Sequence, residues 1–215
     1  AVRRHLVSRG YQEAITYSFI EAGLARQFDD QNEAVALANP ISAEMAVMRT
    51  TIWPGLSKAV AYNQARQQSR VRLFEIGQCF IANGDELEQE KSLAGIISGN
   101  RSPESWMGKS DKVDFFDIKG DLESLLSLGG DASQFKLVAD THHALHPGQS
   151  ARIEKAGITV GWVGAMHPSL QKNLDLAGPV YLFEIKLAVL LDGRLPRFAS
   201  LSKYPESRRD LAMVI

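Results

Sequence analysis

Three histidines stand close together at His142, His143 and His146, and imidazole is a frequent metal ligand in proteins. The first two are sequence neighbours, so their side chains would point apart on an extended chain. No cysteine or carboxylate stands nearby at ligand spacing. Pro147 and Gly148 are typical loop residues. The sequence therefore favours a loop without a metal ion.

Three aspartates have helical spacing. Asp114, Asp117 and Asp121 stand at positions i, i+3 and i+7, so they would form one stripe beside an apolar helix face. Such carboxylates could bind a metal or transfer protons, but acids in the first turn of a helix also complement its dipole. We interpret the stripe as a solvated helix face.

Two groups of basic residues could contact phosphate. The first group is Arg66, Arg70 and Arg72, and the second is Arg194, Arg197, Lys203, Arg208 and Arg209. Because no exposed aromatic residues are interleaved with them, salt bridges to neighbouring acids explain these groups at least as well. The sequence contains no phosphate-binding loop, dinucleotide fingerprint or nucleophile elbow. Residue spacing alone identifies no active site.

The elements that would position such residues are organised around the segment 71–81. Its apolar residues would point to both faces, as in a central strand of a sheet that is covered on both sides. Arg72, Glu75 and Gln78 interrupt this pattern, and burying each without a partner would cost about 2–7 kcal/mol. Gly77 indicates a bulge or a close backbone approach. We therefore expect this strand to line a ligand cleft or a packed interface.

The remaining periodicities predict helices and strands on either side of this strand. Helices are expected over 2–9, from 18 or 21 to 28, over 53–64 with a polar continuation to 70, and from 115 to the glycines at 129 and 130. Within the last helix, Gly120 suggests a close packing contact. Strands are expected over 11–20, 34–38, 92–98, 135–139, 150–155, 158–165 and 180–185, with a turn at 83–85. This pattern predicts an α+β fold with a mainly antiparallel sheet flanked by helices.

The composition is that of a globular domain with a full core. The 215 residues are 45% hydrophobic and 23% charged, which fits one large domain or one domain plus a fragment. The net charge of -1 gives no overall attraction to nucleic acid or anionic lipid. Cys79 is the only cysteine, so an internal disulfide is excluded and a reducing, cytoplasmic location is expected. Since the chain begins without methionine and ends within an apolar run, we expect a segment of a longer protein.

Residues 2–17 carry a helix, a glycine, an aromatic residue and a strand in that order. This order resembles the first signature of class II aminoacyl-tRNA synthetases, a helix and strand used for dimerisation, although Tyr17 stands where that signature ends in proline. Residues 48–50 resemble another short stretch of these enzymes. The resemblance implies the fold of a class II synthetase.

The segment 74–80 resembles the strand of the second signature of the same enzymes. In active members this strand continues into an arginine and then a carboxylate that bind ATP and the amino acid. Here Ile81 and Asn83 take those positions. The nearest match to the third signature, at 184–191, lacks its glycines and its arginine. The resemblance therefore implies a catalytic fold without its ATP-binding residues, and we expect no catalytic, cofactor-binding or metal-binding residue in this segment.

An inactive copy of this fold is typical of the β subunits of bacterial phenylalanyl-tRNA synthetases, and stretches spread over the whole chain resemble them. These stretches are 9–13, 16–19, 39–45, 62–64, 117–123, 146–151 and 203–212. The last one resembles the entry into a ferredoxin-like anticodon-binding domain. The resemblance thus implies a core-like module over 1–200, followed over 201–215 by a linker and the first, truncated strand of that next domain.

By this resemblance the parent enzyme has two α and two β subunits and attaches phenylalanine to tRNA(Phe) with ATP and magnesium. The α subunit carries the active site, so this segment is expected to be a non-catalytic assembly module that pairs with it. The predicted interface residues are Leu6, Ile15, Tyr17 and Phe19. The alternative is a nucleic-acid-binding module that contacts tRNA through Arg66, Arg70 and Arg72. An ATP-binding ligase is a further alternative, but loss of a charge-stabilising donor typically costs about 3 kcal/mol in the transition state.

Overall fold

The computed structural model of the chain describes residues 1–84, 86–106, 108, 110–129, 132–191, 209–210 and 212. The α-helices are α1 (Val2–Ser8), α2 (Ala22–Phe28), α3 (Trp53–Gln64), α4 (Phe115–Leu126), α5 (Pro168–Asn173) and α6 (Ala188–Leu191). The strands are β1 (Gln12–Glu13), β2 (Phe19–Ile20), β3 (Val47–Met48), β4 (Arg70–Asn83), β5 (Glu86–Gly99), β6 (Phe135–Ala139), β7 (Leu145–Lys155), β8 (Ile158–Met166) and β9 (Val180–Lys186). No helix within these ranges is long and apolar enough to cross a membrane.

Seven strands of the described chain form the main sheet, in the order β1-β4-β5-β9-β8-β7-β6. Only β1 and β4 run parallel, and the other neighbouring pairs are antiparallel. The strands β2 and β3 form a separate small antiparallel pair. The α+β prediction with a mainly antiparallel sheet is confirmed.

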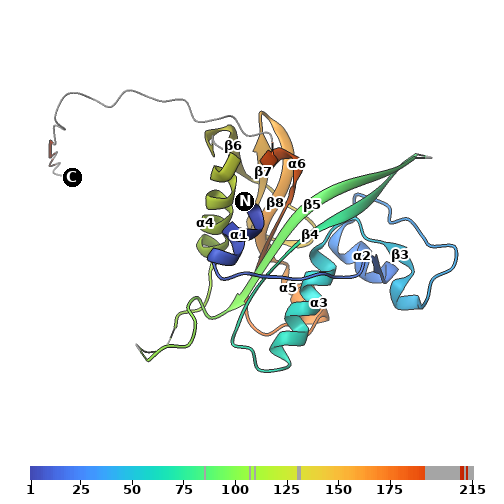
Figure 1. The fold of residues 1–215 in the computed structure, drawn as a ribbon, viewed down its shortest axis with the longest axis horizontal. Coiled ribbons are helices and arrows are strands. Elements are labelled where there is room, and N and C mark those ends of the chain that lie inside the picture. Colours follow the sequence, from blue (N-terminus) through green and yellow to red (C-terminus); the bar gives the residue numbers. More distant parts are fainter. Residues whose placement is uncertain are drawn as a thin grey trace.

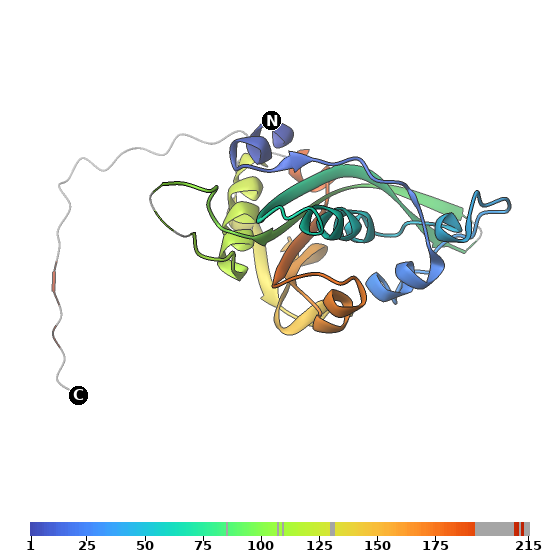
Figure 2. The ribbon, with the colours of Figure 1, turned by 90° about the horizontal axis from the view of Figure 1, so that it is seen from below.

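Helices cover both faces of this sheet (Figures 1 and 2). On one face, α1 and α4 lie side by side, and Ile118, Leu122 and Leu125 of α4 are fully buried against the strands. On the other face, α3 lies across β4 and β5 and buries Leu56 and Val60. The central strand is therefore covered on both sides, as its sequence predicts.

The alternation of side chains along β4 divides its polar residues between the two faces. Arg72 and Phe74 point toward α4, whereas Leu73 and Glu75 point toward α3. Gly77 is on the α3 side, where a Cβ atom would lie 2.1 Å from the Nη2 atom of Arg49. The predicted close approach at Gly77 is confirmed. Only a residue without a side chain leaves room for this arginine.

The hairpin of β4 and β5 is longer than the sequence predicts. The two strands pair along their whole length, from Arg70 with Gly99 to Asn83 with Glu86, and the hairpin extends beyond the rest of the sheet (Figure 1). Asp85, in the predicted turn, lies outside the described residues.

Two of the predicted strands differ from the structure. The segment 11–20 is not one strand, because β1 pairs with β4 whereas β2 pairs with β3. Between them the backbone N–H of Thr16 donates to the carboxylate of Glu75 at 3.3 Å. The segment 34–38 forms only a single bridge, between Ala36 and Val47.

Gly120 does not make the predicted close contact, since a Cβ atom there would meet nothing within 4 Å. The helix α3 ends at Gln64, so the polar run that follows does not continue it. The predicted domain boundary at residue 200 lies outside the described residues, as does most of 201–215.

Candidate functional site

A pocket of about 290 Å³ opens on the α3 side of the sheet. Four neighbouring strands contribute to its lining: β4 through Cys79, β5 through Ser92, β9 through Glu184 and β8 through Trp162. Glu184 and Trp162 are direct partners in the β8–β9 register, so their side chains lie on the same face. The segment after α2, the segment before α3 and His142 in the loop before β7 also contribute to the lining.

The carboxyl group of Glu184 is held from the segment that precedes α3. Its Oε2 atom accepts hydrogen bonds from the Thr51 hydroxyl at 2.6 Å and from the Ile52 backbone N–H at 3.0 Å. Its Oε1 atom lies 3.5 Å from the Cys79 thiol. Burial raises the pKa of Glu184 to about 7, because the few hydrogen bonds offset only part of the lost hydration. Burial also raises the pKa of Cys79, so its thiol stays protonated and is a poor nucleophile.

Aromatic rings form one side of this pocket. The ring of His142 lies between the indoles of Trp53 and Trp162, at centroid distances of 5.2 Å and 4.9 Å. Burial lowers the pKa of His142, which favours the neutral ring, and its Nδ1 atom accepts from the Ala144 backbone N–H. Its sequence neighbour His143 instead faces Asp30, at 3.5 Å. The two imidazoles therefore point apart, as their spacing predicts.

His146 does not join the other two histidines. Its Nδ1 atom accepts from the backbone N–H of Gly148 at 3.0 Å. In the part of the chain that the structure describes, no three histidine, cysteine or acidic side chains are grouped so that they could hold a metal ion.

The lining of the pocket is acidic. Asp29, Glu90 and Glu184 line it, and among the described lining residues Lys186 is the only lysine or arginine. Lys186 pairs with Glu90 at 2.8 Å. Ile81 also lines the pocket, at the position that the resemblance assigns to an ATP-binding arginine. The arrangement suits an apolar or cationic group far better than a triphosphate.

A buried ion pair holds β4 in place beside the pocket. Arg49 and Glu75 lie 2.8 Å apart, and both side chains are almost completely buried. Arg49 also donates to the backbone carbonyl of Gln78 at 2.9 Å and to the Thr16 hydroxyl at 3.0 Å, and that hydroxyl donates to Glu75 at 2.7 Å. Glu75, one of the three polar residues in the central strand, thus has structural partners.

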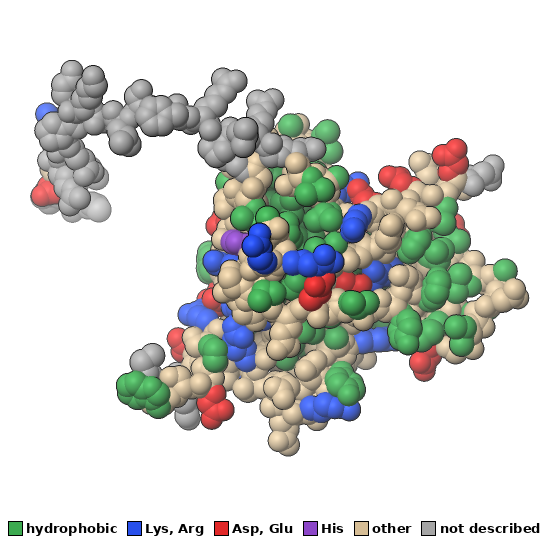
Figure 3. All heavy atoms as spheres, in the orientation of Figure 1, with side chains coloured by type: hydrophobic (Ala, Val, Ile, Leu, Met, Phe, Trp, Pro, Cys, Tyr) green, Lys and Arg blue, Asp and Glu red, His purple; other side chains and the backbone are tan. Residues whose placement is uncertain are grey.

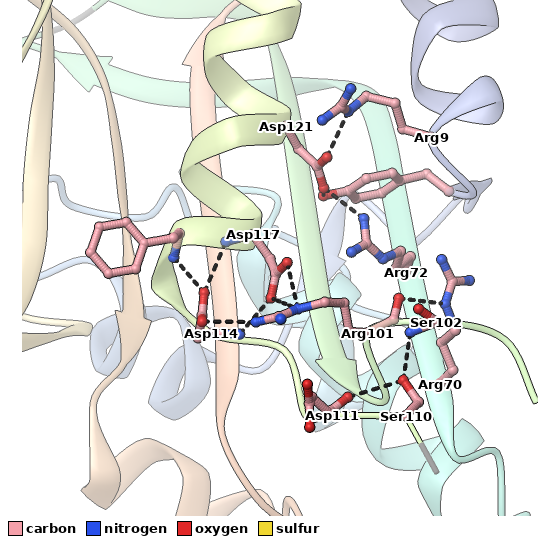
Figure 4. Close-up of polar contacts among 12 residues, drawn as sticks. Arg9, Arg70, Arg72, Arg101, Ser102, Ser110, Asp111, Asp114, Asp117 and Asp121 are labelled. Atoms are coloured by element: carbon pink, nitrogen blue, oxygen red, sulfur yellow. Dashed lines mark hydrogen bonds and ion pairs between the residues drawn. The ribbon is translucent and has the colours of Figure 1, made fainter. Parts of the chain in front are cut away.

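On the α4 side of the sheet, Asp121 is the centre of a second buried network (Figure 4). It pairs with Arg9 at 2.6 Å and with Arg72 at 2.7 Å, and it accepts a hydrogen bond from the Tyr11 phenol at 2.8 Å. Burial and the adjacent carboxylate raise the pKa of Tyr11, so the phenol remains a donor. Asp121 is only 4% exposed, so the interpretation of its stripe as a solvated face is wrong at this residue.

The other two aspartates of the stripe begin α4. The Asp114 carboxylate accepts from the backbone N–H groups of Phe116 and Asp117, and the Asp117 carboxylate accepts from the backbone N–H of Asp114. This is a capping box. Arg101 pairs with both carboxylates, at 2.9 Å and 3.0 Å (Figure 4).

Three of the four predicted interface residues lie around one depression of about 280 Å³: Ile15, Tyr17 and Phe19. Ile15 is 92% exposed and Tyr17 is 71% exposed, whereas Phe19 is half-buried. Leu6 is fully buried in the core that α1 shares with α4, so including it among interface residues was wrong. Whether the other three contact a partner stays a prediction.

The three arginines predicted to contact phosphate have different surroundings. The guanidinium of Arg66 is exposed and lies 3.3 Å from the centre of the Tyr62 ring. Arg70 is half-buried and donates to the Arg101 carbonyl. Arg72 is buried and paired with Asp121, so its prediction as a phosphate contact was wrong.

In the second basic group, Arg209 is exposed. Arg194, Arg197, Lys203 and Arg208 lie outside the described residues.

Residues 1–187 match the family described as "Phenylalanyl tRNA synthetase beta chain CLM domain". The chain belongs to this family. The chain is 54% identical to the phenylalanine–tRNA ligase beta subunits of Pseudomonas fluorescens Pf-5 and Pseudomonas putida KT2440, over 100% and 99% of its length. It is 49% identical to that of Hahella chejuensis over 100% of its length. The matched region is 27% of each of these relatives, so the chain spans about a quarter of their length.

The fold is similar to that of a pyrrolysyl-tRNA synthetase, PylSc of Desulfitobacterium hafniense. The TM-score is 0.65 at 15% sequence identity, over 88% of this chain and 63% of that chain. This similarity confirms that the chain has the predicted class II synthetase-like fold.

The sequence does not predict that four residues lie together in one pocket: Glu184, Thr51, His142 and Trp162. The sequence does contain a signal for Glu184, since this acid interrupts the apolar strand 180–185 in the same way as Glu75 interrupts β4. No sequence signal could bring Thr51 to it, because the two residues are 133 positions apart.

Proposed function

We propose that this chain is a non-catalytic module of the β subunit of a phenylalanine–tRNA ligase and that it serves assembly with the catalytic α subunit. The complete enzyme, with two α and two β subunits, would attach phenylalanine to tRNA(Phe) in the cytoplasm with ATP and magnesium. The observation that carries this proposal is Ile81, an apolar residue in the pocket where an active synthetase of this fold would need a cation. We further propose that residues 201–215 lead into an anticodon-binding domain.

The charges in the pocket support a non-catalytic role. A triphosphate requires cations or metal ions around it, because its charge must be balanced away from water. Here three carboxyl side chains line the pocket together with one lysine, which is already paired. The acidic lining would repel ATP, whereas bulk water solvates its phosphates.

Calorimetric titration of the chain with ATP and magnesium tests this part. We expect no saturable heat, because the lining offers no unpaired cation among its described residues. A saturable heat at micromolar ATP would contradict a non-catalytic role.

The exposed apolar residues after β1 support an assembly role. Ile15 and Tyr17 expose most of their side chains although residues of these types are usually buried or half-buried. Hydrophobic side chains also gather at the right of the molecule in Figure 3, over the region of β3 and the loop before it. Permanent subunit interfaces commonly bury about 2,000 Å² or more and are more apolar than the remaining surface.

Introducing negative charge at this surface tests the assembly role. In the complete β chain, Ile15→Glu combined with Tyr17→Glu should weaken binding to the α subunit, since two carboxylates would become buried without partners. Ile158→Glu is the matched control, because Ile158 is 69% exposed but lies at the start of β8. Size-exclusion chromatography with light scattering would show whether the complex forms. Assembly of the folded double variant at wild-type affinity would place the interface elsewhere.

The alternative role, contact with tRNA through the segment 66–72, has less support. Of its three arginines only Arg66 is exposed, and Arg72 is buried. An electrophoretic shift at increasing salt would test it, because each phosphate contact steepens the salt dependence by about one unit. If Arg66→Ala left both the affinity and the slope unchanged, this segment would have no role in tRNA binding.

A further inference from the structure

The pocket beside Glu184 is a built cavity and not a surface irregularity. Its volume of about 290 Å³ is close to the lower end of small-molecule pockets, which is about 300 Å³. Cys79, Ser92, Glu184 and Trp162 stand on four hydrogen-bonded strands, which hold their backbones at fixed spacing. Such a site can accept a small ligand without rearrangement of the sheet.

The carboxyl group of Glu184 keeps acceptor capacity for a ligand. A carboxylate offers about four lone-pair positions. Two are used at Oε2 by Thr51 and Ile52, whereas the described partner of Oε1 is a thiol at 3.5 Å, which is a weak donor. Among the described residues, no arginine or lysine forms an ion pair with this carboxyl. A donor from outside the protein would therefore improve its pairing.

The remaining lining indicates which donor would fit. Glu90 and Asp29 add negative charge, and Lys186 is paired with Glu90, so a cation is favoured and an anion is opposed. The rings of Trp162 and His142 and the side chain of Phe28 offer apolar surface, and an ammonium group is also attracted to an indole face.

We propose that this pocket binds a small primary amine with an apolar or aromatic body and no carboxylate. The ammonium group would donate to Glu184, and the body would pack against Trp162 and His142. This inference is independent of the proposed assembly role, since the exposed residues Ile15 and Tyr17 do not line the pocket.

Four probes with the same phenyl body but different charges test the proposal on the 215-residue chain. They are 2-phenylethylamine, the neutral 2-phenylethanol, the anionic 3-phenylpropanoate and the zwitterion phenylalanine. Binding would be measured by calorimetry and by ligand-detected NMR. We expect the amine to bind about tenfold or more tightly than each of the others. The alcohol and the propanoate lack an ammonium group that could donate to Glu184, and the carboxylate of phenylalanine is repelled by the acidic lining.

Two variants locate the binding. Glu184→Gln keeps the shape of the side chain but removes its charge, and it should weaken amine binding about tenfold or more without changing the affinity for 2-phenylethanol. Glu123→Gln is the matched control and should bind as the wild type does, because Glu123 is an exposed residue of α4 that pairs with Lys119.

Three results would overturn the proposal. They are no amine binding at about 10 mM, equal affinity for all four probes, or unchanged amine binding by a folded Glu184→Gln variant. If that variant failed to fold, the order of affinities among the four probes on the wild-type chain would still decide the question.

Discussion

Two carboxyl groups on opposite faces of the same sheet have contrasting surroundings. Asp121, on the α4 side, pairs with two guanidinium groups and accepts a hydrogen bond from a phenol. Glu184, on the α3 side, has a hydroxyl, a backbone N–H and a thiol as partners and faces a pocket of about 290 Å³. The first group has its charge compensated within the protein, and the second does not.

This difference separates a structural charge from a group that is available to a ligand. Through Arg9, Tyr11 and Arg72, the Asp121 network links the segment between α1 and β1, and also β4, to α4. Removing one partner from such a buried ion pair would leave the other charge uncompensated. Glu184 lacks such partners, so its burial disfavours the charged form and lowers the stability of the fold at neutral pH. Buried titratable groups with perturbed pKa values in a cleft are where binding sites are found.

The comparison is tested most strongly by Asp121→Asn. We expect the free energy of unfolding to fall by about 3–5 kcal/mol, because Arg9 and Arg72 would lose the charge that compensates them. Urea denaturation would measure the loss. The control is Glu123→Gln in the exposed pair with Lys119, which should cost about 0.5 kcal/mol or less. A loss below about 1 kcal/mol at Asp121 would show that the network contributes little.

An apolar substitution on the same helix separates packing from charge. Leu122 follows Asp121 in sequence and is fully buried against the sheet. Truncation in Leu122→Ala should lower the free energy of unfolding by about 2–5 kcal/mol, through lost burial and the remaining cavity. This loss comes from packing alone, since no charge is removed. An unchanged denaturant midpoint would mean that α4 packs differently.

The central strand β4 shows which structural features can be predicted from the sequence alone. Its apolar pattern and its three polar residues predict a covered strand with polar partners. The structure confirms this for Arg72 and Glu75, whereas Gln78 is exposed. The partners themselves could not be predicted, because Arg49 and Asp121 lie 26 and 49 positions from Glu75 and Arg72 and only the folded chain brings them together. Local patterns identify a need for pairing but do not identify the pair.

The wrong predictions for Asp121 and Leu6 have a related cause. The spacing of Asp114, Asp117 and Asp121 is the same whether the stripe faces solvent or the protein interior, and only the position of α1 and β4 decides which. Leu6 was assigned to an interface from the dimerisation role of its helix, but that helix packs on α4 within the same chain. Tertiary contacts override both assignments.

The pH dependence of stability tests the other carboxyl. The pKa of Glu184 is about 7 in the folded chain against an ordinary value of 4.5, so the folded state binds this proton more tightly than the unfolded state. The free energy of unfolding should therefore fall as pH rises from about 4.5 to above 7. Relative to Glu184→Gln, the wild type should lose about 2–3 kcal/mol over this range.

Chemical denaturation at several pH values would measure this difference. His142 also titrates in this range, but it is present in both proteins, so comparing them isolates Glu184. A difference that stays constant with pH would mean that Glu184 is charged and compensated, like Asp121.

The smallest effect is expected at the exposed end of the same stripe, where Asp114 caps α4. Its carboxylate accepts two backbone hydrogen bonds and also pairs with Arg101, so two contributions are combined in one residue. Asp114→Ala removes both and should cost about 1 kcal/mol. Asp114→Asn keeps a cap acceptor but weakens the ion pair, so it should cost only a few tenths of that amount, because exposed ion pairs contribute little.

Salt distinguishes the two contributions in the same denaturation experiment. Hydrogen bonds at the cap should persist at about 1 M salt, whereas an exposed ion pair is screened at distances beyond about 3 Å. The difference between the Ala and Asn variants should therefore be the same at low and high salt. If instead the Asn variant were as unstable as the Ala variant at low salt and recovered at high salt, the charge of Asp114 would matter more than its cap. An exposed carboxylate would then stabilise the fold in the way proposed only for the buried Asp121.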